Sequence, residues 1–432
     1  MRRDVLSWNR IPRVDHARVV DVASRFDELP LGESERAIPH GNGRSYGDVC
    51  LAPGATVLRT RRLDRFIAFD RVAGRVRCEG GVLLGEILDL IVPQGWFLPV
   101  TPGTRHVTVG GAIANDVHGK NHHVAGSFGH HVTAFELLRS DGERLVCGPE
   151  TFPEWYAATV GGLGLTGLIT WADLRLEPIA NPFVVAESRR FRSLDAFWEM
   201  NAEAERDWPY TVSWIDCLAP GGRGILMTGR HAPPRPDLPA WRERRLRFPV
   251  ESPLSLVNAP SLRAFNFAYY HKPLPKGPTL AHAVPWFYPL DAIGDWNRMY
   301  GRRGFRQYQC VLPRAAAKDG IAELLARIAR SGSGSFLAVL KTFGSRRSVG
   351  MLSFPREGAT LALDFPDHGT ASERLFADLD AVVREAGGAL YPAKDCRMSP
   401  AMFRAGYPLA DRFSSFVDPK FASGFWRRVM EC

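Results

Sequence analysis

A glycine-punctuated segment, Pro102–His123, constrains the fold of this chain more than any other part of its sequence. It reads PGTRHVTVGGAIANDVHGKNHH, so glycines are mixed with small and β-branched residues, and titratable side chains close the run. A main chain that must approach a ligand closely requires glycine, because a Cβ atom would block the approach. A flat or polyanionic ligand can then lie against the backbone amides. We therefore expect this segment to form one wall of a cofactor site.

Short strands and helices are expected on both sides of this segment. Alternating patterns predict strands at Thr56–Arg59, Val76–Glu79, Phe135–Arg139 and Leu168–Leu176. Helical spacing of apolar residues predicts helices at Asp15–Leu29, from Leu83 to Ile91 ahead of Pro93, and at Pro153–Val160, Ala316–Ser331 and Ala371–Ala386. Proline-rich stretches at Pro233–Pro239 and Pro253–Pro289 predict loops, and aromatic residues in the second favour a lid or binding surface over core packing. The C-terminal stretch carries one helical pattern.

The length and composition favour a globular protein with two domains. A chain of 432 residues exceeds one simple core, and the sequence PIANP at Pro178–Pro182 predicts a boundary. No apolar run reaches the roughly 20 residues that span a bilayer. The chain opens with two arginines but has no apolar region after them, so we expect no Sec signal and a cytoplasmic location.

The net charge of +9 favours anionic partners, which include a phosphate-bearing ligand, a membrane surface and nucleic acid. The basic residues are spread along the chain without a nucleic-acid-binding motif, so we do not expect nucleic acid to be the partner. The seven cysteines form no CxxC pair, which argues against a disulfide framework and a structural zinc site. We expect most of them to be buried.

Of two further glycine motifs, one is interpreted as part of a phosphate site and the other is rejected as a dinucleotide-binding site. His40–Asp48 reads HGNGRSYGD, and its G-x-G turn is by itself most simply a tight turn. Because Gly80-Gly81 and Pro102–His123 follow it, a composite phosphate site is the better interpretation. Gly162–Gly167 matches the dinucleotide fingerprint G-x-G-x-x-G, but a helical pattern precedes it and a strand pattern follows. That order is the reverse of what a Rossmann site needs, so no such site is expected there.

Histidines crowd into a short segment at His118, His122, His123, His130 and His131. Their spacing lacks the i, i+4 pattern of a helical zinc site, and no cysteine or carboxylate cluster accompanies them. We expect no metal, and we favour a contact between one of these histidines and the cofactor.

Several long motifs together identify a family. The strings GNGRSYGD, PGTRHVTVGGAIANDVHGKNHH, AGSFGHHV, VGGLGLTGLI and YPAKDCR resemble those of FAD-binding oxidoreductases of the vanillyl-alcohol-oxidase type. Within that group the chain resembles the branch of decaprenylphosphoryl-β-D-ribose oxidases. WFYPLDAIGDWNRMYG, FRQYQCVLP, FLAVLKTFG and LDFP extend the similarity over nearly the whole chain.

The resemblance implies an α+β fold with a two-part FAD-binding domain and an inserted substrate domain of sheet and helices. The FAD domain would comprise residues 1–178 and 389–432, and the substrate domain residues 179–388. It also implies that the cofactor contacts are Gly41, Asn42, Gly43, Arg44, Ser45, Tyr46, Thr101, Pro102, Gly103, Thr104, Thr108, Gly110, Gly111, Ala114, His118, Gly119, Gly164 and Ile169.

Two positions differ from related oxidases. Sugar-lactone and alditol oxidases commonly carry, at the position of Arg44, a histidine that bonds covalently to the flavin. Arginine does not form that bond, so the resemblance implies non-covalent FAD and favours the ribose-oxidase branch. Ala362 stands before LDFP where some relatives have cysteine, so no thiol takes part in the chemistry at that position.

By the same resemblance, Lys394 and Tyr46 lie at the reacting hydroxyl. Oxidation of a secondary alcohol needs a hydride acceptor and a base for the hydroxyl proton, and a lysine held near another cation has the lowered pKa that a base requires. Gln307, Gln309 and Lys341 would orient the sugar or its phosphate, and Lys120 is a further candidate for that anion. From composition alone, each lysine would more simply be a solvated surface charge.

The implied activity is FAD-dependent oxidation of a polyprenyl-phosphoryl-D-ribose at C2′ to the 2′-keto sugar, the first half of epimerisation to the arabinose form. A separate NAD(P)H-dependent reductase would complete the epimerisation. Aromatic loops and a basic surface suit peripheral contact with a membrane that presents the lipid-linked substrate. Two alternatives remain: an FAD-dependent oxidase of a soluble sugar, alditol or aldonolactone, and a non-enzymatic basic binding protein.

Overall fold

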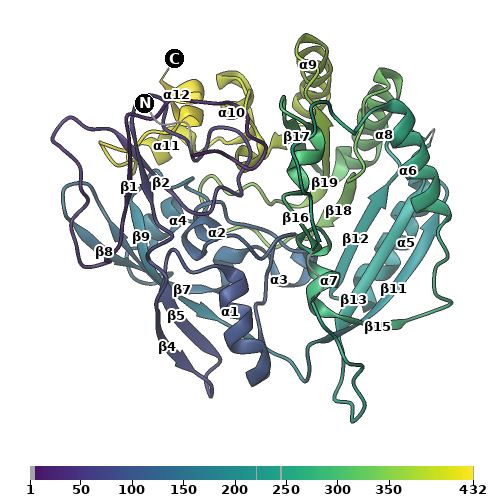
Figure 1. Cartoon of the computed structure of the whole chain (residues 1–432), viewed down its shortest axis with the longest axis horizontal. Coiled ribbons are helices and arrows are strands. Elements are labelled where there is room, and N and C mark those ends of the chain that lie inside the picture. Colours follow the sequence, from purple (N-terminus) through teal and green to yellow (C-terminus); the bar gives the residue numbers. More distant parts are fainter. Residues whose placement is uncertain (1–4, 220, 244–245, 432) are drawn as a thin grey trace.

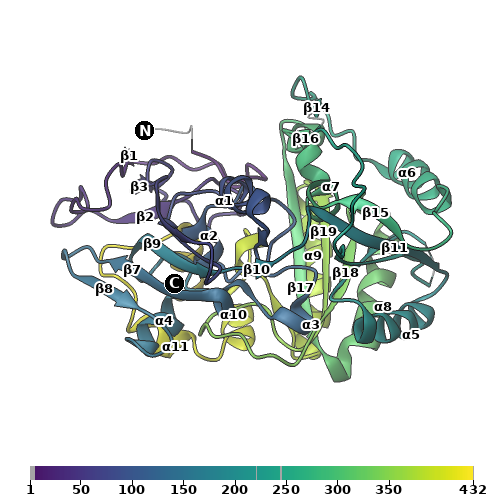
Figure 2. The same cartoon turned by 90° about the horizontal axis from the view of Figure 1, so that it is seen from below.

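The computed structural model describes residues 5–219, 221–243 and 246–431. Two groups of sheets, each covered by helices, lie side by side (Figures 1 and 2). The purple to blue N-terminal part and the yellow C-terminal part of the chain form one lobe, and the green and teal middle of the chain forms the other.

The first lobe contains a five-stranded antiparallel sheet and a three-stranded parallel sheet. The larger sheet has the order β4 (Phe66–Asp70), β5 (Arg75–Glu79), β9 (Leu168–Arg175), β7 (Val132–Leu138) and β8 (Arg144–Cys147). The smaller has the order β1 (Arg18–Asp21), β3 (Thr56–Arg59) and β2 (Ala37–His40). Strands β3, β5, β7 and β9 confirm the four predicted strands within a few residues.

Short helices connect these strands and include α1 (Leu84–Ile91), α2 (Val109–Ala114), α3 (His122–Ala125) and α4 (Pro153–Thr159). Of the predicted apolar face of α1, Ile87, Leu88 and Ile91 are buried, whereas Leu83 lies at the N-cap and is partly buried. The chain then forms a 3₁₀ turn that contains Pro93, and Gly95 ends it in the left-handed region with φ 81°. The predicted helices at Leu83–Ile91 and Pro153–Val160 are therefore confirmed as α1 and α4.

The C-terminal residues return to the first lobe as three short helices, α10 (Pro400–Gly406), α11 (Ala410–Ser414) and α12 (Gly424–Met430). The backbone amide of Ala37 in β2 donates to the carbonyl of Lys420 over 2.7 Å, and the amide of Ala422 donates back to Ala37 over 2.9 Å. The two ends of the chain therefore share one lobe.

The second lobe is an eight-stranded antiparallel sheet with helices on one face. Its order is β15 (Thr279–His282), β11 (Phe183–Phe191), β13 (Gly224–His231), β12 (Tyr210–Ile215), β18 (Val339–Phe343), β19 (Gly358–Pro366), β17 (Phe305–Pro313) and β20 (Ala389–Leu390). Helices α5 (Leu194–Asp207), α8 (Arg314–Ser331) and α9 (Thr370–Glu385) cover that face. Helices α8 and α9 confirm two predicted helices.

The remaining elements are two short strand pairs and two helices of the second lobe (Figure 1). They are β6 (Trp96–Phe97), β10 (Glu177–Pro178), β14 (Leu246–Arg247), β16 (Ile293–Gly294), α6 (Ala259–His271) and α7 (Ala283–Phe287). Strand β10 ends at Pro178 and β11 begins at Phe183, so the chain enters the large sheet where a boundary was predicted. It leaves that sheet after β20, two residues beyond the predicted boundary at 388.

Three predicted elements are wrong. Asp15–Leu29 forms no helix, because its β-branched Val19 and Val20 pair in β1 with β3. Pro253–Pro289 is not one loop, because Asn258 caps α6 through its side chain and Pro260 sits in the first turn, where proline is tolerated. The single helix expected near the C-terminus is three helices, since Pro408 follows α10 and Pro419 precedes α12. Pro233–Pro239 does lack helix and strand, as predicted.

The motif Gly162–Gly167 lies after α4 and before β9. The helix therefore precedes the glycines and the strand follows them, which confirms that the motif is not a Rossmann site.

Candidate active site

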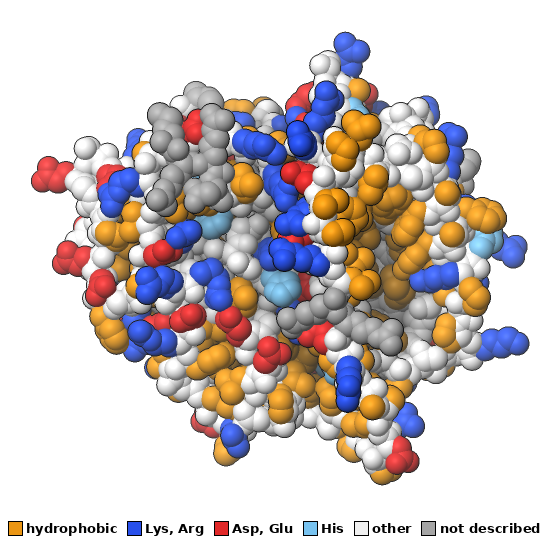
Figure 3. Space-filling model, viewed as in Figure 1, with side chains coloured by type: hydrophobic (Ala, Val, Ile, Leu, Met, Phe, Trp, Pro, Cys, Tyr) orange, Lys and Arg blue, Asp and Glu red, His pale blue; other side chains and the backbone are white. Residues whose placement is uncertain are grey.

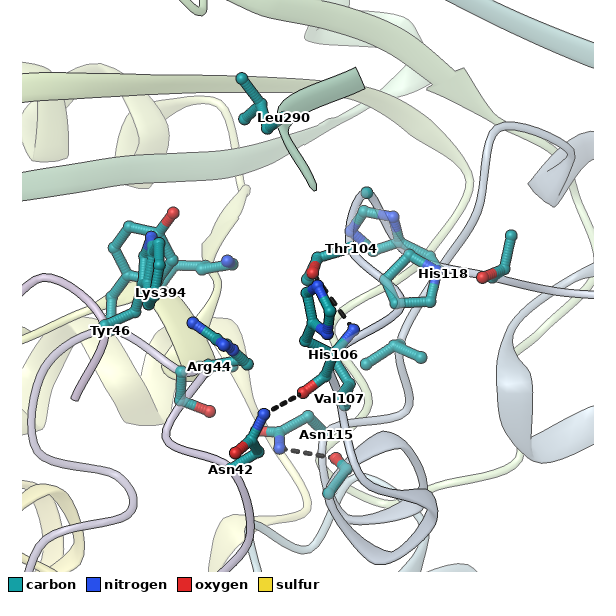
Figure 4. A pocket seen from close by; sticks show the side chains of 18 of the residues that line it. Asn42, Arg44, Tyr46, Thr104, His106, Val107, Asn115, His118, Leu290 and Lys394 are labelled. Carbon is teal, nitrogen blue, oxygen red and sulfur yellow. Dashed lines mark hydrogen bonds between the residues drawn. The ribbon is translucent and has the colours of Figure 1, made fainter. Parts of the chain in front are cut away.

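A cavity of about 800 Å³ lies between the two lobes. This is a size typical of ligand sites, and the cavity is lined by both lobes and by the segment around Lys394. Every residue that the sequence suggested for the cofactor, the substrate or catalysis lines this one cavity. Their individual roles remain predictions. Figure 4 shows Lys394, Tyr46 and Arg44 on one side of the cavity and His118 on the other.

The wall from Pro102 to Gly119 fits a flat ligand with polar edges. A Cβ atom added at Gly103 would meet no protein atom within 4 Å, and the same holds at Gly164, so both glycines face open space in the cavity. Gly164 also needs its glycine because its φ of 76° is left-handed. The Thr108 hydroxyl accepts from the amide of Gly111 over 3.1 Å and so caps α2.

Buried polar atoms also point to a polar ligand in the cavity. Within the described residues, the Asn115 side-chain oxygen and the Arg44 Nε have no hydrogen-bond partner in the protein. Buried polar atoms are normally satisfied, so a ligand with complementary groups fits this wall. The Asn42 side chain donates to the carbonyl of His106 over 2.8 Å and ties the Gly41–Ser45 turn to the glycine-rich wall (Figure 4).

Arg44 lies at the base of this turn, with its guanidinium 4.2 Å from the centre of the Trp8 ring. Burial lowers the pKa of Arg44, and the carboxylates of Asp291 and Asp295 oppose that shift. The carbonyl of Trp8 accepts from the Asn297 side chain over 2.8 Å, so Trp8 connects the turn to the second lobe. No sequence motif surrounds Trp8, and sequence reasoning did not identify it as a site residue.

Lys394 lies against Tyr46, with its Nζ atom 3.9 Å from the centre of the Tyr46 ring. The amide of Tyr46 donates to the carbonyl of Ala393 over 2.8 Å, which holds the two segments in register. Burial lowers the pKa of Lys394, and the nearby Asp364 carboxylate opposes that shift. Burial raises the pKa of Tyr46 well above its usual value. A neutral lysine beside a protonated tyrosine can accept a proton from a hydroxyl.

Asp364 is a second residue that sequence reasoning missed. It lines the cavity from β19 and is 2% exposed. Its carboxylate accepts from the Gln307 side chain over 2.6 Å, whereas the Gln307 oxygen is buried without a partner within the described residues. Burial raises the pKa of Asp364, and Lys394 opposes this shift. An aspartate within the otherwise apolar stretch Leu361–Phe365 was the available signal in the sequence.

His118 lies at the centre of a hydrogen-bonded network with Lys341 and Gln309. Its Nδ1 atom is 2.7 Å from the Lys341 Nζ and its Nε2 atom is 3.1 Å from the Gln309 Nε2. Lys341 also donates to the carbonyl of Gly119 over 2.8 Å. Burial lowers the pKa of His118 well below its usual value, and the Lys341 charge lowers it further. Burial likewise lowers the pKa of Lys341, with Lys120 adding to the effect. His118 is therefore neutral at physiological pH.

Lys120 approaches the same region from the wall. Its Nζ donates to the carbonyl of Phe287 over 2.7 Å and lies 5.3 Å from the centre of the Trp286 ring. Burial lowers the pKa of Lys120 to about 8, against an opposing effect of Asp291. An anionic group in the cavity would favour the charged form of this lysine.

The other histidines of the cluster lie outside the cavity lining. His122 packs against Phe343 with ring centres 4.6 Å apart, and burial lowers its pKa to about 3. His123, His130 and His131 contact backbone carbonyls of Trp208, Arg347 and Ala125. Over the described ranges, His, Cys, Asp and Glu side chains form no group of three or more suited to a metal.

The cysteines are free thiols at the positions described. Cys78, Cys147, Cys217 and Cys310 are buried, and Cys50 and Cys396 are partly buried, which confirms the expectation for most of them. Cys432 lies outside the described residues. Ala362 lines the cavity on β19, at the position where the resemblance indicated a cysteine in some relatives.

Comparisons with known proteins agree with this geometry. Residues 32–148 match the family model described as an FAD binding domain. The chain is 36% identical to the decaprenylphosphoryl-β-D-ribose oxidase of Mycolicibacterium smegmatis over 91% of its own length and 88% of that protein. It is also 36% identical to the "uncharacterized protein in mprA 5′ region" of Streptomyces coelicolor, over 81% of this chain and all of that protein. An alditol oxidase of a Streptomyces species is 29% identical over 46% of each chain.

Among the described residues, none of the helices has both the length and the apolar character needed to cross a bilayer. The fold is an α+β FAD-binding fold, and FAD is the cofactor, since the family model covers the wall that fits a flat ligand. The chain belongs to the decaprenylphosphoryl-β-D-ribose oxidase family and is an FAD-dependent oxidoreductase.

Proposed function

We propose that this enzyme oxidises the C2′ hydroxyl of a polyprenyl-phosphoryl-D-ribose to the 2′-keto sugar. The observation that carries the proposal is the position of Lys394, which lies against Tyr46 in a cavity bounded on one side by the glycine-lined wall. The similarity to the mycobacterial oxidase over most of both chains supports the same substrate class. This oxidation would be the first half of an epimerisation to the arabinose form.

Lys394 is the proposed base. The C2′–H bond breaks with its electron pair while the hydroxyl O–H bond passes its proton to the neutral Nζ atom, and a C=O bond forms. FAD, when bound, supplies the acceptor for that hydride. Tyr46, protonated over the whole physiological range because of its burial, donates a hydrogen bond that orients the hydroxyl. Gln307, Gln309 and Lys341 orient the ribose, and Lys120 binds the phosphate.

The residues proposed to bind FAD are those that line the glycine-rich side of the cavity, from Gly41–Tyr46 through Thr101–Gly119 to Gly164 and Ile169. We propose that FAD is not covalently bound, because the arginine at position 44 lacks the nucleophilic imidazole of tethered relatives. Acid precipitation should therefore release the flavin into the supernatant. Flavin that stays with the protein pellet would contradict this.

We propose that the domain division follows the two lobes. Residues 1–178 and the return from about residue 389 form the FAD-binding domain, and residues 179–388 form an inserted substrate-binding domain. The pairing of the Ala37 backbone with Lys420 and Ala422 supports a two-part first domain. The antiparallel sheet from β11 to β19 supports an inserted second domain.

We propose two partners. The first is a separate NAD(P)H-dependent reductase that acts on the keto sugar. The second is the cytoplasmic face of a membrane, which contains the lipid that carries the substrate. Exposed apolar side chains occur at Leu246, Val250 and Leu254, which are 69%, 65% and 77% exposed. Figure 3 shows hydrophobic side chains gathered on this lobe beside Lys and Arg side chains. Apolar groups flanked by positive charge favour an anionic membrane surface.

The membrane contact is tested by sedimentation with vesicles of anionic phospholipid. The protein should pellet with them, and Leu254→Glu should reduce the bound fraction. Absence of binding, with undiminished activity on a short-chain analogue, would count against a membrane role.

The substrate proposal is tested without oxygen in a stopped-flow spectrometer. Addition of a prenyl-phosphoryl ribose should bleach the flavin absorbance, and the product should be a 2′-keto sugar by mass spectrometry. The arabinose epimer serves as the matched control, because its C2′ hydrogen lies on the opposite face of the ring. An unbleached flavin at millimolar substrate would refute the proposed function.

A second candidate is oxidation of a soluble sugar, alditol or aldonolactone, which the similarity to an alditol oxidase over 46% of the chain favours. Arg44 weighs against it. A substrate screen with peroxide detection distinguishes the two functions.

A further inference from the structure

The sheet face that lines the cavity is polar at its β17–β19 end. Directly opposed residues of antiparallel strands point to the same face, so the strand register defines this surface. Gln307 lies opposite Asp364, Gln309 lies opposite Ala362, and Lys341 lies opposite Thr360. All six line the cavity. Polar side chains therefore dominate the part of the face nearest the proposed base.

The same face becomes apolar at its β12–β13 end. Trp214 on β12 lies opposite Val339 on β18, which is two residues before Lys341 and so shares its face. Val212, two residues before Trp214, lies opposite Met227 on β13. These four residues line the cavity, and Met227 and Val339 are partly exposed to it. The polar surface thus continues without interruption into an apolar arm of the cavity.

Helix α6 borders this arm through Tyr269. Its buried face docks through Asn266, which donates to the Asp216 carboxylate over 2.7 Å, and through Leu262 and Tyr270. Tyr269 turns toward the cavity and packs on Trp214 with ring centres 4.7 Å apart. Figure 3 shows a hollow lined by hydrophobic side chains on the lobe that carries α6.

We propose that this arm binds the first isoprenoid units of the substrate's lipid chain. The lining residues are Val212, Trp214, Met227, Tyr269, Leu337 and Val339. The inference rests on the proposed function, since the polar half of the same face then holds the ribose and phosphate. A chain attached to the phosphate enters the arm because the arm is continuous with that half and is lined mainly by apolar side chains and aromatic rings. The enzyme thereby selects a lipid-linked sugar over a free one.

The test compares farnesyl-phosphoryl ribose with propyl-phosphoryl ribose on the FAD-loaded enzyme. Each buried methylene favours binding roughly fourfold, so the farnesyl substrate should show a kcat/KM at least about tenfold higher, mostly through KM. Met227→Trp fills the arm and should lower kcat/KM about tenfold for the farnesyl substrate and less than about twofold for the propyl one. Leu337→Asn, at a partly exposed position, serves as a second variant with the same expected pattern.

Phe267→Ala is the matched control, because Phe267 lies on α6 but is 61% exposed and outside the cavity lining. It should leave both substrates unchanged. Equal kcat/KM for the two substrates, or loss of the chain-length preference only in Phe267→Ala, would overturn the proposal. Calorimetric binding of farnesyl phosphate, with a negative heat-capacity change in the wild type and reduced affinity in Met227→Trp, tests the arm without turnover. If neither substrate is oxidised but this binding persists, the proposed reaction fails and the apolar arm stands.

Discussion

At the scale of single residues, the proposed chemistry depends on a lysine whose burial disfavours its charged form. Lys394 lies on the Tyr46 ring at 3.9 Å, and burial lowers its pKa. We expect Lys394→Ala to keep its flavin and to lose sugar oxidation by a factor of about 10²–10⁴, the usual contribution of a general base. The measurement is anaerobic flavin reduction by substrate, with the visible spectrum as the record of cofactor content.

Lys318→Ala is the control for this substitution, because Lys318 is 64% exposed and pairs with Asp195 on the far helices of the second lobe. It should turn over like the wild type. Turnover that survives in Lys394→Ala would assign the base to another residue.

We expect Asp364 to influence the pKa of Lys394 through its charge. A base must be neutral, so the rate of flavin reduction should rise with pH through the lowered pKa of Lys394. The Asp364 carboxylate stabilises the charged lysine and so raises this pKa against the effect of burial. Asp364→Asn removes the charge and keeps an oxygen for Gln307, so the acid limb of the pH profile should move to lower pH. The measurement is the reduction rate from pH 5 to 10.

Lys120 and Lys341 also face the cavity, and their lowered pKa values contribute ionisations of their own. Lys120→Ala therefore accompanies the pH series as a control, and it should raise KM without moving the acid limb of kcat. An acid limb that does not move in Asp364→Asn, or that moves to higher pH, would contradict the assignment of the acid limb to Lys394.

The site residues that could be predicted from the sequence are marked by continuous motifs, whereas those that were missed are not. Gly103, His118 and Lys394 belong to continuous motifs, and the structure brings them to one cavity. Trp8 contacts the site from a distant segment without a motif around it, and Asp364 lies in the short string LDFP, which indicated the family but no role for the aspartate. Their importance depends on tertiary packing, which a linear pattern does not encode.

At the scale of elements, Gly103 belongs to the glycine-rich segment from Pro102 to Gly119 that lines the cavity. A Cβ atom at Gly103 meets no protein atom within 4 Å, so the apoprotein has room for a larger side chain. We expect Gly103→Val to leave the melting temperature of the apoprotein within about 1 °C, since nothing in the protein is displaced, and to weaken FAD binding by about tenfold or more. FAD fluorescence quenching measures the affinity.

Gly32→Val is the matched control, because its added Cβ would meet only the Glu35 side chain, at 3.8 Å or more, and Gly32 lies outside the cavity lining. It should change neither property. A lower apoprotein melting temperature in Gly103→Val would instead identify a folding role for this glycine.

The correctness of each element prediction follows from what stabilises that element. Helix α1 was predictable because Ile87, Leu88 and Ile91 repeat at helical spacing, and all three are buried. Residues 15–29 show a similar apolar spacing, yet Val19 and Val20 pair in β1 with β3, and Phe26 is 71% exposed. Helix α6 was missed because the prolines around it suggested a loop, whereas Asn258 supplies its cap. Tertiary pairing and capping therefore decided these cases.

At the scale of the whole molecule, the two lobes share a core. One buried apolar cluster includes Val5 and Ile38 of the first lobe, Leu361 of the large sheet and Phe425 of the last helix. The cavity proposed to hold FAD lies across the same junction and is lined by both lobes. A ligand in that cavity therefore stabilises the joined molecule and not one lobe alone.

We expect titration of the apoprotein with FAD to raise the temperature of a single unfolding transition. A ligand that binds only the folded state adds about 2.7 kcal/mol at a free concentration of about 100 times Kd, because binding draws the equilibrium away from the unfolded chain. Differential scanning calorimetry measures the effect, with ATP as a control that offers an adenine and phosphates without the flavin ring. Two transitions of which FAD moves only the first would show that the lobes unfold independently. Their shared cluster from Val5 to Phe425 would then contribute little to cooperativity.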